Sequence, residues 1–421
     1  MADIAAKPGA ARDNRVVPAA KKLGPIAVAA LTIGNMIGSR ASHMTRILIL
    51  YASVGTGHQR AARALEQAFA RLPNCEVRVE DTLAFAPPVF RDAYARSYLE
   101  MVAKAPALWQ RYYQDTDRGD PEHIARSNLL RGRAEELLIA RLDDYISRYG
   151  PAAIVCTHYL PAEVLARQKL TGELHAAIYT TVTDHVAHSF WLTPGVDGYF
   201  VASELPRDLL IARGVPGASI HVSGIPVSLE IGVPKNPASI RAHHGWPLDR
   251  PLISLLGGGI ATTHVRQMVE GLRALAQPGT LVVVGGRNAD VPGALADLTD
   301  GPHMRIQVLG HIDELDDLVA ASDLVITKAG GLVVSEELAR GTPLLVIDPI
   351  PGQEEWNADY VVSAGAGVQL RLPVWVPYIV QRLLAEPSRL TAMRERAGRA
   401  SRPRAALEIA EHVLGELRSQ G

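Results

Sequence analysis

Two glycines and a glutamate stand in a stretch whose spacing could bind a charged sugar donor. Gly330 and Gly331 follow a short apolar run, Asp323–Thr327, that is typical of a buried parallel strand, and a helix is predicted over Val333–Arg340. The free backbone N–H groups at the start of such a helix are well placed to bind an anion. Glu336, one turn into this helix, is placed to accept hydrogen bonds from a sugar hydroxyl. A site that binds both an anion and a sugar indicates a nucleotide-sugar ligand.

A polar pair follows the next predicted strand, Pro343–Ile347, and the Pro-rich turn after it. This pair is Gln353-Glu354. Taken singly, each residue has an ordinary explanation: Glu336 suits the acidic preference of a first helical turn, and Gln353-Glu354 suits a polar loop. The specific signal is their combination, because all of them point to one crevice.

A possible proton acceptor, His58, follows the first predicted strand, Ile47–Tyr51. The turn before it is no phosphate-binding P-loop, because Lys and Ser/Thr do not follow at the required spacing. Gly55-x-Gly57 resembles a dinucleotide fingerprint, but Arg60 occupies the place of its third glycine. The turn could instead present His58 at the carboxyl end of the sheet, where an imidazole could take a proton near neutral pH. The ordinary alternative is that His58 only caps or packs the turn.

Aromatic and basic residues are concentrated between residues 83 and 115. The aromatic residues are Phe85, Phe90, Tyr94, Tyr98, Trp109, Tyr112 and Tyr113, and the basic ones are Arg91, Arg96, Lys104 and Arg111. Such a mixture on helices suits a membrane interface with anionic lipid, whereas two ordinary core helices are the alternative.

Further polar residues follow the strands predicted for the amino-terminal half. Thr157-His158 ends the strand Ala153–Cys156, and Thr183-Asp184-His185 ends the strand Ala177–Val182. These clusters and His58 converge on one edge of a parallel sheet, where open α/β sheets bind ligands. One long helix is predicted between them, over Ala134–Tyr149.

The carboxyl-terminal half repeats the alternation of strand, glycine turn and helix. Its five predicted strands are Pro251–Leu256, Leu281–Val284, Ile306–Leu309, Asp323–Thr327 and Pro343–Ile347. Gly257-Gly258-Gly259 follows the first strand, Arg287 follows the second, and Ile312 follows the third. The Arg287 guanidinium could reach a phosphate or a base. The last helix, Ala405–Leu417, could pack on either half.

Length and composition favour a two-domain α/β protein in a reducing compartment. A chain of 421 residues exceeds one ordinary core, and 36 glycines suit many tight strand–helix turns. The formal net charge of −1 argues against dedicated nucleic-acid binding. The two cysteines, Cys75 and Cys156, and the scattered histidines show no metal-ligand spacing. No metal site is therefore expected.

Residues 1–43 do not resemble the start of this domain. They carry six Lys/Arg against two Asp, and their apolar run, Pro25–Ile37, is shorter than the ~20 residues of a spanning helix. Met44 opens a natural first strand. We expect residues 1–43 to be a disordered extension, a fused remnant or the product of a mis-called start. The expected domains are then 44–230 and 251–421, with a linker over 231–250.

From Met44 to about residue 415 the chain resembles the monogalactosyldiacylglycerol synthase and processive diacylglycerol glucosyltransferase family. These are relatives of the peptidoglycan GlcNAc transferase. The matching text is ILILYASVGTGHQRAARAL, TVTDHVAHSFW, VSGIPV and ITKAGGLVVSEELARGTPLLVIDPIPGQEEWNA. The resemblance implies an α/β GT-B architecture: two Rossmann-like domains, with the acceptor in the first and the UDP-sugar mostly in the second. It also implies that no metal is required.

The resemblance further implies roles for individual residues. His58 matches the base toward the acceptor hydroxyl, and Asp184 matches an acidic position facing the same site. The donor-binding matches are Gly258 and Gly259 in the phosphate-facing loop, Ile312 at the uracil, Gly330, Gly331 and Ser335 along the diphosphate, Glu336 at the ribose, and Gln353 with Glu354 at the sugar. The chain departs from the family pattern in His188-Ser189 and in its GGGI loop, which bear on acceptor and donor-sugar identity.

The expected function is transfer of galactose or glucose from a UDP-sugar to diacylglycerol or a similar lipid. We expect a cytoplasmic enzyme bound peripherally to the membrane surface, including anionic lipid, with no nucleic-acid partner. The alternatives are a UDP-GlcNAc transferase to another lipid acceptor, a UDP-GlcNAc 2-epimerase on the same plan, and an inactive UDP-sugar sensor.

Overall fold

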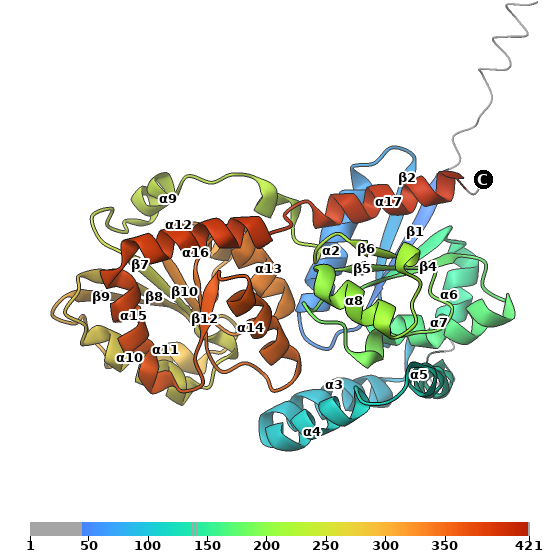
Figure 1. Cartoon of the computed structure of the whole chain (residues 1–421), viewed down its shortest axis with the longest axis horizontal. Helices are drawn as coiled ribbons and strands as arrows, with labels where there is room; N and C mark the ends of the chain where they lie inside the picture. The colour runs from blue at the N-terminus through green and yellow to red at the C-terminus, as the bar shows by residue number, and fades with distance from the viewer. Residues whose placement is uncertain (1–43, 137–138, 140, 420–421) are drawn as a thin grey trace, which may run out of the picture. The chain divides into compact units, whose positions relative to one another are not determined.

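The described residues form two parallel β-sheets, each covered by helices (Figure 1). The structure is a computed structural model that describes residues 44–136, 139 and 141–419. Residues 45–421 form one compact unit. Residues 1–43, where an extension was expected, lie outside the described residues.

The first sheet has the strand order β2-β1-β3-β4-β5-β6, and all its neighbouring strands are parallel. Its strands are β1 (Thr45–Tyr51), β2 (Cys75–Asp81), β3 (Ala153–Cys156), β4 (Ala177–Thr181), β5 (Gly198–Val201) and β6 (Ile220–Val222). Strands β1, β3 and β4 lie within two residues of the runs predicted for them.

Strand β1 is buried on both faces. Ile47 and Ile49 pack into one hydrophobic cluster, whereas Leu48 and Leu50 pack into another, and all four side chains are fully buried. Alternate residues of a strand point to opposite faces, so an uninterrupted apolar run requires helices on both sides of the sheet. The helices of this half are α2 (Gly57–Ala70), α3 (Pro88–Lys104), α4 (Pro106–Thr116), α5 (Pro121–Glu136), α6 (Arg141–Tyr149), α7 (Tyr159–Thr171) and α8 (Glu204–Ala212).

The prediction of a single helix over Ala134–Tyr149 is wrong. Helix α5 ends at Glu136, and α6 starts only at Arg141. Between them, Ile139 is fully buried in the cluster that covers one face of the first sheet. Asp143 and Asp144 lie in the first turn of α6, where acidic side chains complement the helix dipole. Of the described residues in the predicted run, those up to Glu136 end α5, Ile139 is a bend, and those from Arg141 to Tyr149 form α6.

The second sheet has the order β12-β11-β10-β7-β8-β9 and is also parallel. Its strands are β7 (Leu252–Leu256), β8 (Gly279–Val284), β9 (Met304–Leu309), β10 (Leu324–Thr327), β11 (Leu344–Val346) and β12 (Gly367–Gln369). Five strands were expected, so β12 is a correction. This edge strand has three half-buried residues and therefore leaves no apolar run in the sequence.

The helices of the second half alternate with its strands. They are α9 (Pro237–His244), α10 (Thr262–Arg273), α11 (Asp290–Ala294), α12 (Leu315–Ala321), α13 (Gly331–Ala339), α14 (Gln353–Ser363), α15 (Val376–Ala385) and α16 (Pro387–Ala400). Residues 231–250, expected as a linker, contain α9, and Trp246 beyond it packs into a cluster with Leu252 and Leu318.

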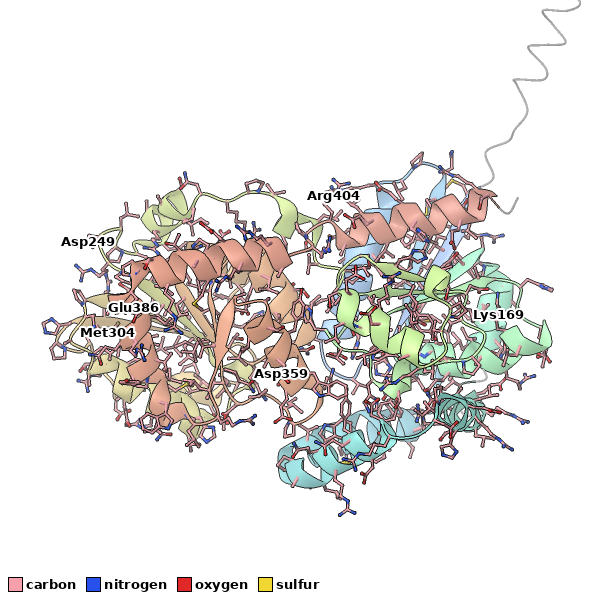
Figure 2. All side chains as sticks on the ribbon, viewed as in Figure 1. Lys169, Asp249, Met304, Asp359, Glu386 and Arg404 are labelled. Carbon is pink, nitrogen blue, oxygen red and sulfur yellow. The ribbon has the colours of Figure 1, made fainter. Side chains whose placement is uncertain are left out.

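The last helix, α17 (Ala405–Ser419), packs on the first sheet (Figure 1). Its Ile409 and Val413 are fully buried in a cluster with Ile47 and Ile49 of β1. Arg404 immediately precedes this helix, beyond the end of α16 (Figure 2). The last described helix thus packs on the half that contains β1.

Candidate functional site

His58 lies at the start of α2, just beyond the carboxyl end of β1. Its Nδ1 is 2.9 Å from the carbonyl oxygen of Thr157 and 3.0 Å from Oγ1 of Thr183. A carbonyl can only accept, so Nδ1 carries the proton in this geometry and Nε2 keeps an open lone pair. The Thr157 hydroxyl also donates to the backbone carbonyl of His58, at 2.9 Å. The ends of β3 and β4 therefore fix the ring and its tautomer.

The imidazole of His58 is neutral at physiological pH. Burial lowers its pKa to about 4, and the hydrogen bond with the Thr157 carbonyl only partly opposes this. The ring of His158 meets it edge-on, with centroids 4.6 Å apart. A half-buried, neutral and oriented imidazole can accept a proton through Nε2.

Asp184 connects the end of β4 to helix α14. Its Oδ1 accepts hydrogen bonds from Nε2 of Gln353 at 2.9 Å and from Nδ2 of Asn357 at 3.4 Å. Burial raises the pKa of Asp184 to about 6, although both amides oppose the shift. A carboxylate from the first half thus orients an amide of the second half.

A cavity of about 250 Å³ brings these side chains together. His58, Asp184 and Gln353 all line it. The other lining residues are Val54, Tyr94, Met101, Trp109, Tyr112, Tyr113, Arg131, Glu135, His158, Tyr159, His188, Phe190 and Trp191. Polar groups able to do chemistry therefore share a space with a largely aromatic wall, which is the usual character of a small-molecule site.

The aromatic segment divides between this cavity and the surface. Trp109 and Tyr113 of α4 are buried in a cluster with Phe190. Tyr113 also packs on Gly352, where a Cβ would lie 2.6 Å from the ring and where φ is +86°. By contrast, Leu108 on the same helix is 61% exposed. The side chain of Tyr98 is outside those described.

Several ionisable residues in the cavity wall were not predicted as site residues. Arg131 of α5 forms a bidentate ion pair with Glu163 of α7, and its guanidinium lies over the ring of Phe190. Glu135 is buried, its pKa is raised to about 7 by burial, and its Oε2 has no hydrogen-bond partner among the described residues. Nothing in the local pattern of a polar helix marks these residues, because their burial depends on α7 and on the loop after β4.

The glycine loop after β7 is packed against the next strand end. A Cβ on Gly258 would lie 2.9 Å from the carbonyl oxygen of Gly285, so a side chain does not fit there. Gly259 approaches the side chain of Lys328. Arg287 is exposed in the turn after β8, and Ile312 is half-buried after β9. These residues share the carboxyl edge of the second sheet, and they do not line the cavity around His58.

Helix α13 meets the first half at its amino end. Gly330 caps the helix, and a Cβ on Gly331 would lie only 2.1 Å from the carbonyl oxygen of Thr183. The Ser335 hydroxyl donates to the Gly331 carbonyl at 2.9 Å and lies 3.3 Å from Nε2 of His185. The glycine here permits close approach of two backbones, which is a packing role beside the predicted contact with the diphosphate.

Glu336 faces a different cavity from His58. It forms an ion pair with Arg60 of α2, and both line a second cavity of about 330 Å³. Burial raises the pKa of Glu336, and Arg60 counteracts this. The structure therefore brings His58, Asp184 and Gln353 together but places Glu336 apart from them.

Lys328, which was not predicted as a site residue, lies beside Glu354. Its Nζ is 3.7 Å from Oε2 of Glu354, and the same oxygen accepts a hydrogen bond from the backbone N–H of Ile350 at 2.7 Å. His264 of α10 likewise pairs with Asp348, which has a φ of +48°. A lysine directly after a buried strand and before two glycines was a usable signal, because strand ends carry the ligand contacts of such sheets.

The described helices include none that is long and apolar enough to cross a lipid bilayer.

Two family models match the chain. Residues 58–227 match monogalactosyldiacylglycerol (MGDG) synthase, and residues 254–409 match the glycosyltransferase family 28 C-terminal domain. A protein of Bacillus cytotoxicus named processive diacylglycerol beta-glucosyltransferase is 28% identical over 378 residues, which are 89% of this chain and 95% of that protein. A protein of the same name from Bacillus mycoides is 27% identical over 88% of this chain and 94% of its own.

Solved structures share the fold at low sequence identity. MurG of Acinetobacter baumannii has a TM-score of 0.58 at 16% identity, covering 88% of this chain and 99% of MurG. The calicheamicin glycosyltransferase CalG4 has a TM-score of 0.56 at 16% identity, covering 88% and 98%. A UDP-GlcNAc 2-epimerase from Neisseria meningitidis, bound to UDP-GlcNAc, has a TM-score of 0.57 at 12% identity, covering 88% and 100%. The expected α/β GT-B architecture is therefore confirmed.

Proposed function

We propose that this chain, which matches the family models of monogalactosyldiacylglycerol synthase and of the glycosyltransferase family 28 C-terminal domain, transfers a hexose from a UDP-sugar to the free hydroxyl of diacylglycerol. The observation that carries the proposal is the cavity in which an oriented, neutral His58 shares an aromatic-walled space with Asp184 and Gln353. Such a wall suits the glycerol backbone and the first carbons of a lipid acceptor.

In the proposed reaction, Nε2 of His58 takes the proton of the acceptor hydroxyl. The acceptor oxygen forms a bond to the anomeric carbon as the bond from that carbon to the UDP oxygen breaks. UDP departs with the bonding electrons. The Thr157 carbonyl holds Nδ1–H, so it keeps Nε2 available and stabilises the imidazolium that forms.

Residues of the second half are assigned to the donor. Gln353 and Glu354 would hold the hexose, with Asp184 fixing the Gln353 amide and Lys328 beside Glu354. Gly258, Gly259, Arg287 and Ile312 would receive the nucleotide, and Glu336 would receive the ribose. The amino end of α13, at Gly330, Gly331 and Ser335, offers N–H groups and a helix dipole to the charge on the leaving diphosphate. This arrangement supplies charge stabilisation without requiring a cation.

We further propose that the enzyme works at the cytoplasmic surface of a membrane. Diacylglycerol stays in the bilayer, so the cavity must reach it there. Val89 of α3 and Leu108 of α4 are 82% and 61% exposed, respectively, and they belong to the segment whose inner face lines the cavity. Exposed apolar side chains next to Arg91 and Arg111 suit an interface with anionic lipid.

A panel of UDP-glucose, UDP-galactose and UDP-GlcNAc with diacylglycerol vesicles tests the proposal, with the lipid product read by mass. We expect the mass of one hexose to be added, and UDP to be released only when the lipid is present. Release of UDP without lipid, or conversion of UDP-GlcNAc to its 2-epimer, would instead favour the isomerase. Addition of N-acetylhexosamine to a different lipid would favour the other transferase.

A further inference from the structure

Two histidines and a glutamate, none of which lines the substrate cavity, meet where α17 packs on the edge of the first sheet. His221 lies in β6, and His412 and Glu416 lie one turn apart on α17. Their potential ligand atoms are all within 4.8 Å of one another. The imidazole rings are 3.8 Å apart between centroids. Residues at i and i+4 share one face of a helix, so α17 presents both of its side chains to the edge strand.

The spacing of the two helical side chains fits a shared cation. Nε2 of His412 is 3.3 Å from Oε1 of Glu416, yet this buried nitrogen makes no hydrogen bond among the described residues. Zinc binds nitrogen and oxygen at about 2.0–2.2 Å, so two ligands at a tetrahedral angle stand about 3.4 Å apart. The nitrogen of the half-buried His221 lies within 4.8 Å of both of these ligand atoms.

Neighbouring residues would hold these ligands in place. The hydroxyl of Tyr179 in β4 donates to Oε2 of Glu416 at 2.6 Å, which leaves Oε1 facing His412. The ring of Phe200 in β5 meets His412 edge-on, with centroids 5.6 Å apart. Hydrogen bonds to the outer atom of a ligand and an apolar wall are the usual surroundings of a metal site. Glu416 is 38% exposed, so an ion and a water ligand have access from solvent.

We propose that His221, His412 and Glu416 form a binding site for a divalent transition metal of the zinc class. Two imidazoles and one carboxylate are borderline ligands that select such ions over Mg²⁺ or Ca²⁺. The site contains none of the residues assigned to donor, acceptor or proton transfer. A bound ion would tie β6 to α17, and so fasten the end of the chain to the first sheet. Metal at this position stabilises the fold and takes no part in the glycosyl transfer.

The test uses tag-free full-length protein, dialysed against chelator and then titrated with Zn²⁺ or Co²⁺ alone. We expect one ion per chain, the visible absorption of Co²⁺ in a site of low coordination number, and a rise in Tm. The rise in Tm is about 3 °C at free metal about 100 times Kd. His221→Asn and His412→Gln should each abolish the Co²⁺ absorption and the rise in Tm. Tyr179→Phe should weaken the affinity roughly 10–100-fold, because it removes only the outer hydrogen bond.

His243→Asn provides the control, since His243 is an exposed histidine of α9 outside the cluster. It should bind metal as the wild type does. Metal binding that persists in both His221→Asn and His412→Gln would overturn the proposal, as would a wild-type protein that binds no Zn²⁺ at micromolar concentration. If either variant folds poorly, the Co²⁺ titration of the Tyr179→Phe protein still tests the proposal. A Co²⁺ affinity equal to that of the wild type would contradict it.

Discussion

At the scale of single residues, two ionisable groups in the cavity have pKa values displaced in opposite directions. Burial lowers the pKa of His58 to about 4 and raises that of Asp184 to about 6. Burial disfavours the charged form of each, which is the imidazolium in one case and the carboxylate in the other. His58 therefore stays neutral wherever Asp184 is ionised, and the two states required by the proposed reaction coexist above pH 6.

His58→Ala should lower turnover by roughly 10²–10⁴-fold, because it removes the general base. UDP binding and Tm should stay close to wild type, since the donor residues belong to the other half. Steady-state kinetics and calorimetry with UDP measure these quantities. His175→Ala, at a histidine outside the cavity, serves as the control. Unchanged turnover in His58→Ala would remove this residue from the mechanism.

The activity of the wild type should fall as the pH drops through about 6. Asp184 then takes up a proton, and its carboxyl group accepts less strongly from Gln353 and Asn357. In Asp184→Asn this decline should disappear, and the maximal activity should be lower than that of the wild type. Any remaining loss of activity in acid should lie nearer pH 4, where His58 is protonated. The profile of kcat/KM between about pH 4 and pH 8 shows both declines. A wild-type profile that is flat across that range would contradict a requirement for the ionised carboxylate.

At the scale of elements, glycines decide how closely helices approach the first half. Gly331→Ala should destabilise the protein by roughly 1–3 kcal/mol, because its Cβ would lie 2.1 Å from the Thr183 carbonyl and two backbones must separate. Gly398→Ala in α16 is the matched control, since a Cβ there meets nothing within 4 Å. The control should be neutral or up to about 1 kcal/mol more stable. Denaturant unfolding compares the two, and equal stability would mean that the close approach relaxes freely.

The α3–α4 segment carries the second prediction at this scale. Leu108→Glu should lower activity on diacylglycerol in vesicles roughly tenfold, because it removes an apolar side chain from the proposed interface. Activity on a short-chain acceptor dispersed in detergent should not change. Leu205→Glu on α8, where Leu205 is 51% exposed, is the control and should leave both activities intact. Equal loss on both acceptors would indicate damage to the cavity instead of lost membrane contact.

At the scale of the whole molecule, an ion pair between the halves competes with the proposed ribose contact. Arg60 of α2 pairs with Glu336 of α13, so the donor can reach that carboxylate only when the pair opens. Arg60→Ala should lower the KM for the UDP-sugar by roughly 2–5-fold, a size typical of a partly exposed pair. Arg63→Ala changes the same charge in the same cavity, but Arg63 pairs with Glu66, so it should not lower KM. A raised KM in Arg60→Ala would mean that Arg60 binds the donor itself.

The alternation of strands and helices could be predicted from the sequence because its causes are local. Strand β3 has the predicted bounds, and β1 differs only by two residues at its start. His58 and Asp184 were expected at one edge of the first sheet, because each follows a strand of that parallel sheet, and both line the cavity. Gln353 follows a strand of the second sheet, and its contact with Asp184 was not predicted. Failures arose where the local signal was weak, as in the three-residue strand β12 and the bend between α5 and α6.

The sequence by itself thus determined the two-sheet architecture and the edge at which the site is built, since hydrophobic runs and glycine turns act over a few residues. Only the tertiary structure decided which side chains become partners across the chain. The pairing of Arg60 with Glu336 joins residues 276 positions apart, and the meeting of His221 with His412 depends on where α17 returns. The carboxyl group of Glu135 is likewise buried because other elements cover a helix whose sequence is polar. Such contacts follow from the packing of distant elements, and no local pattern encodes them.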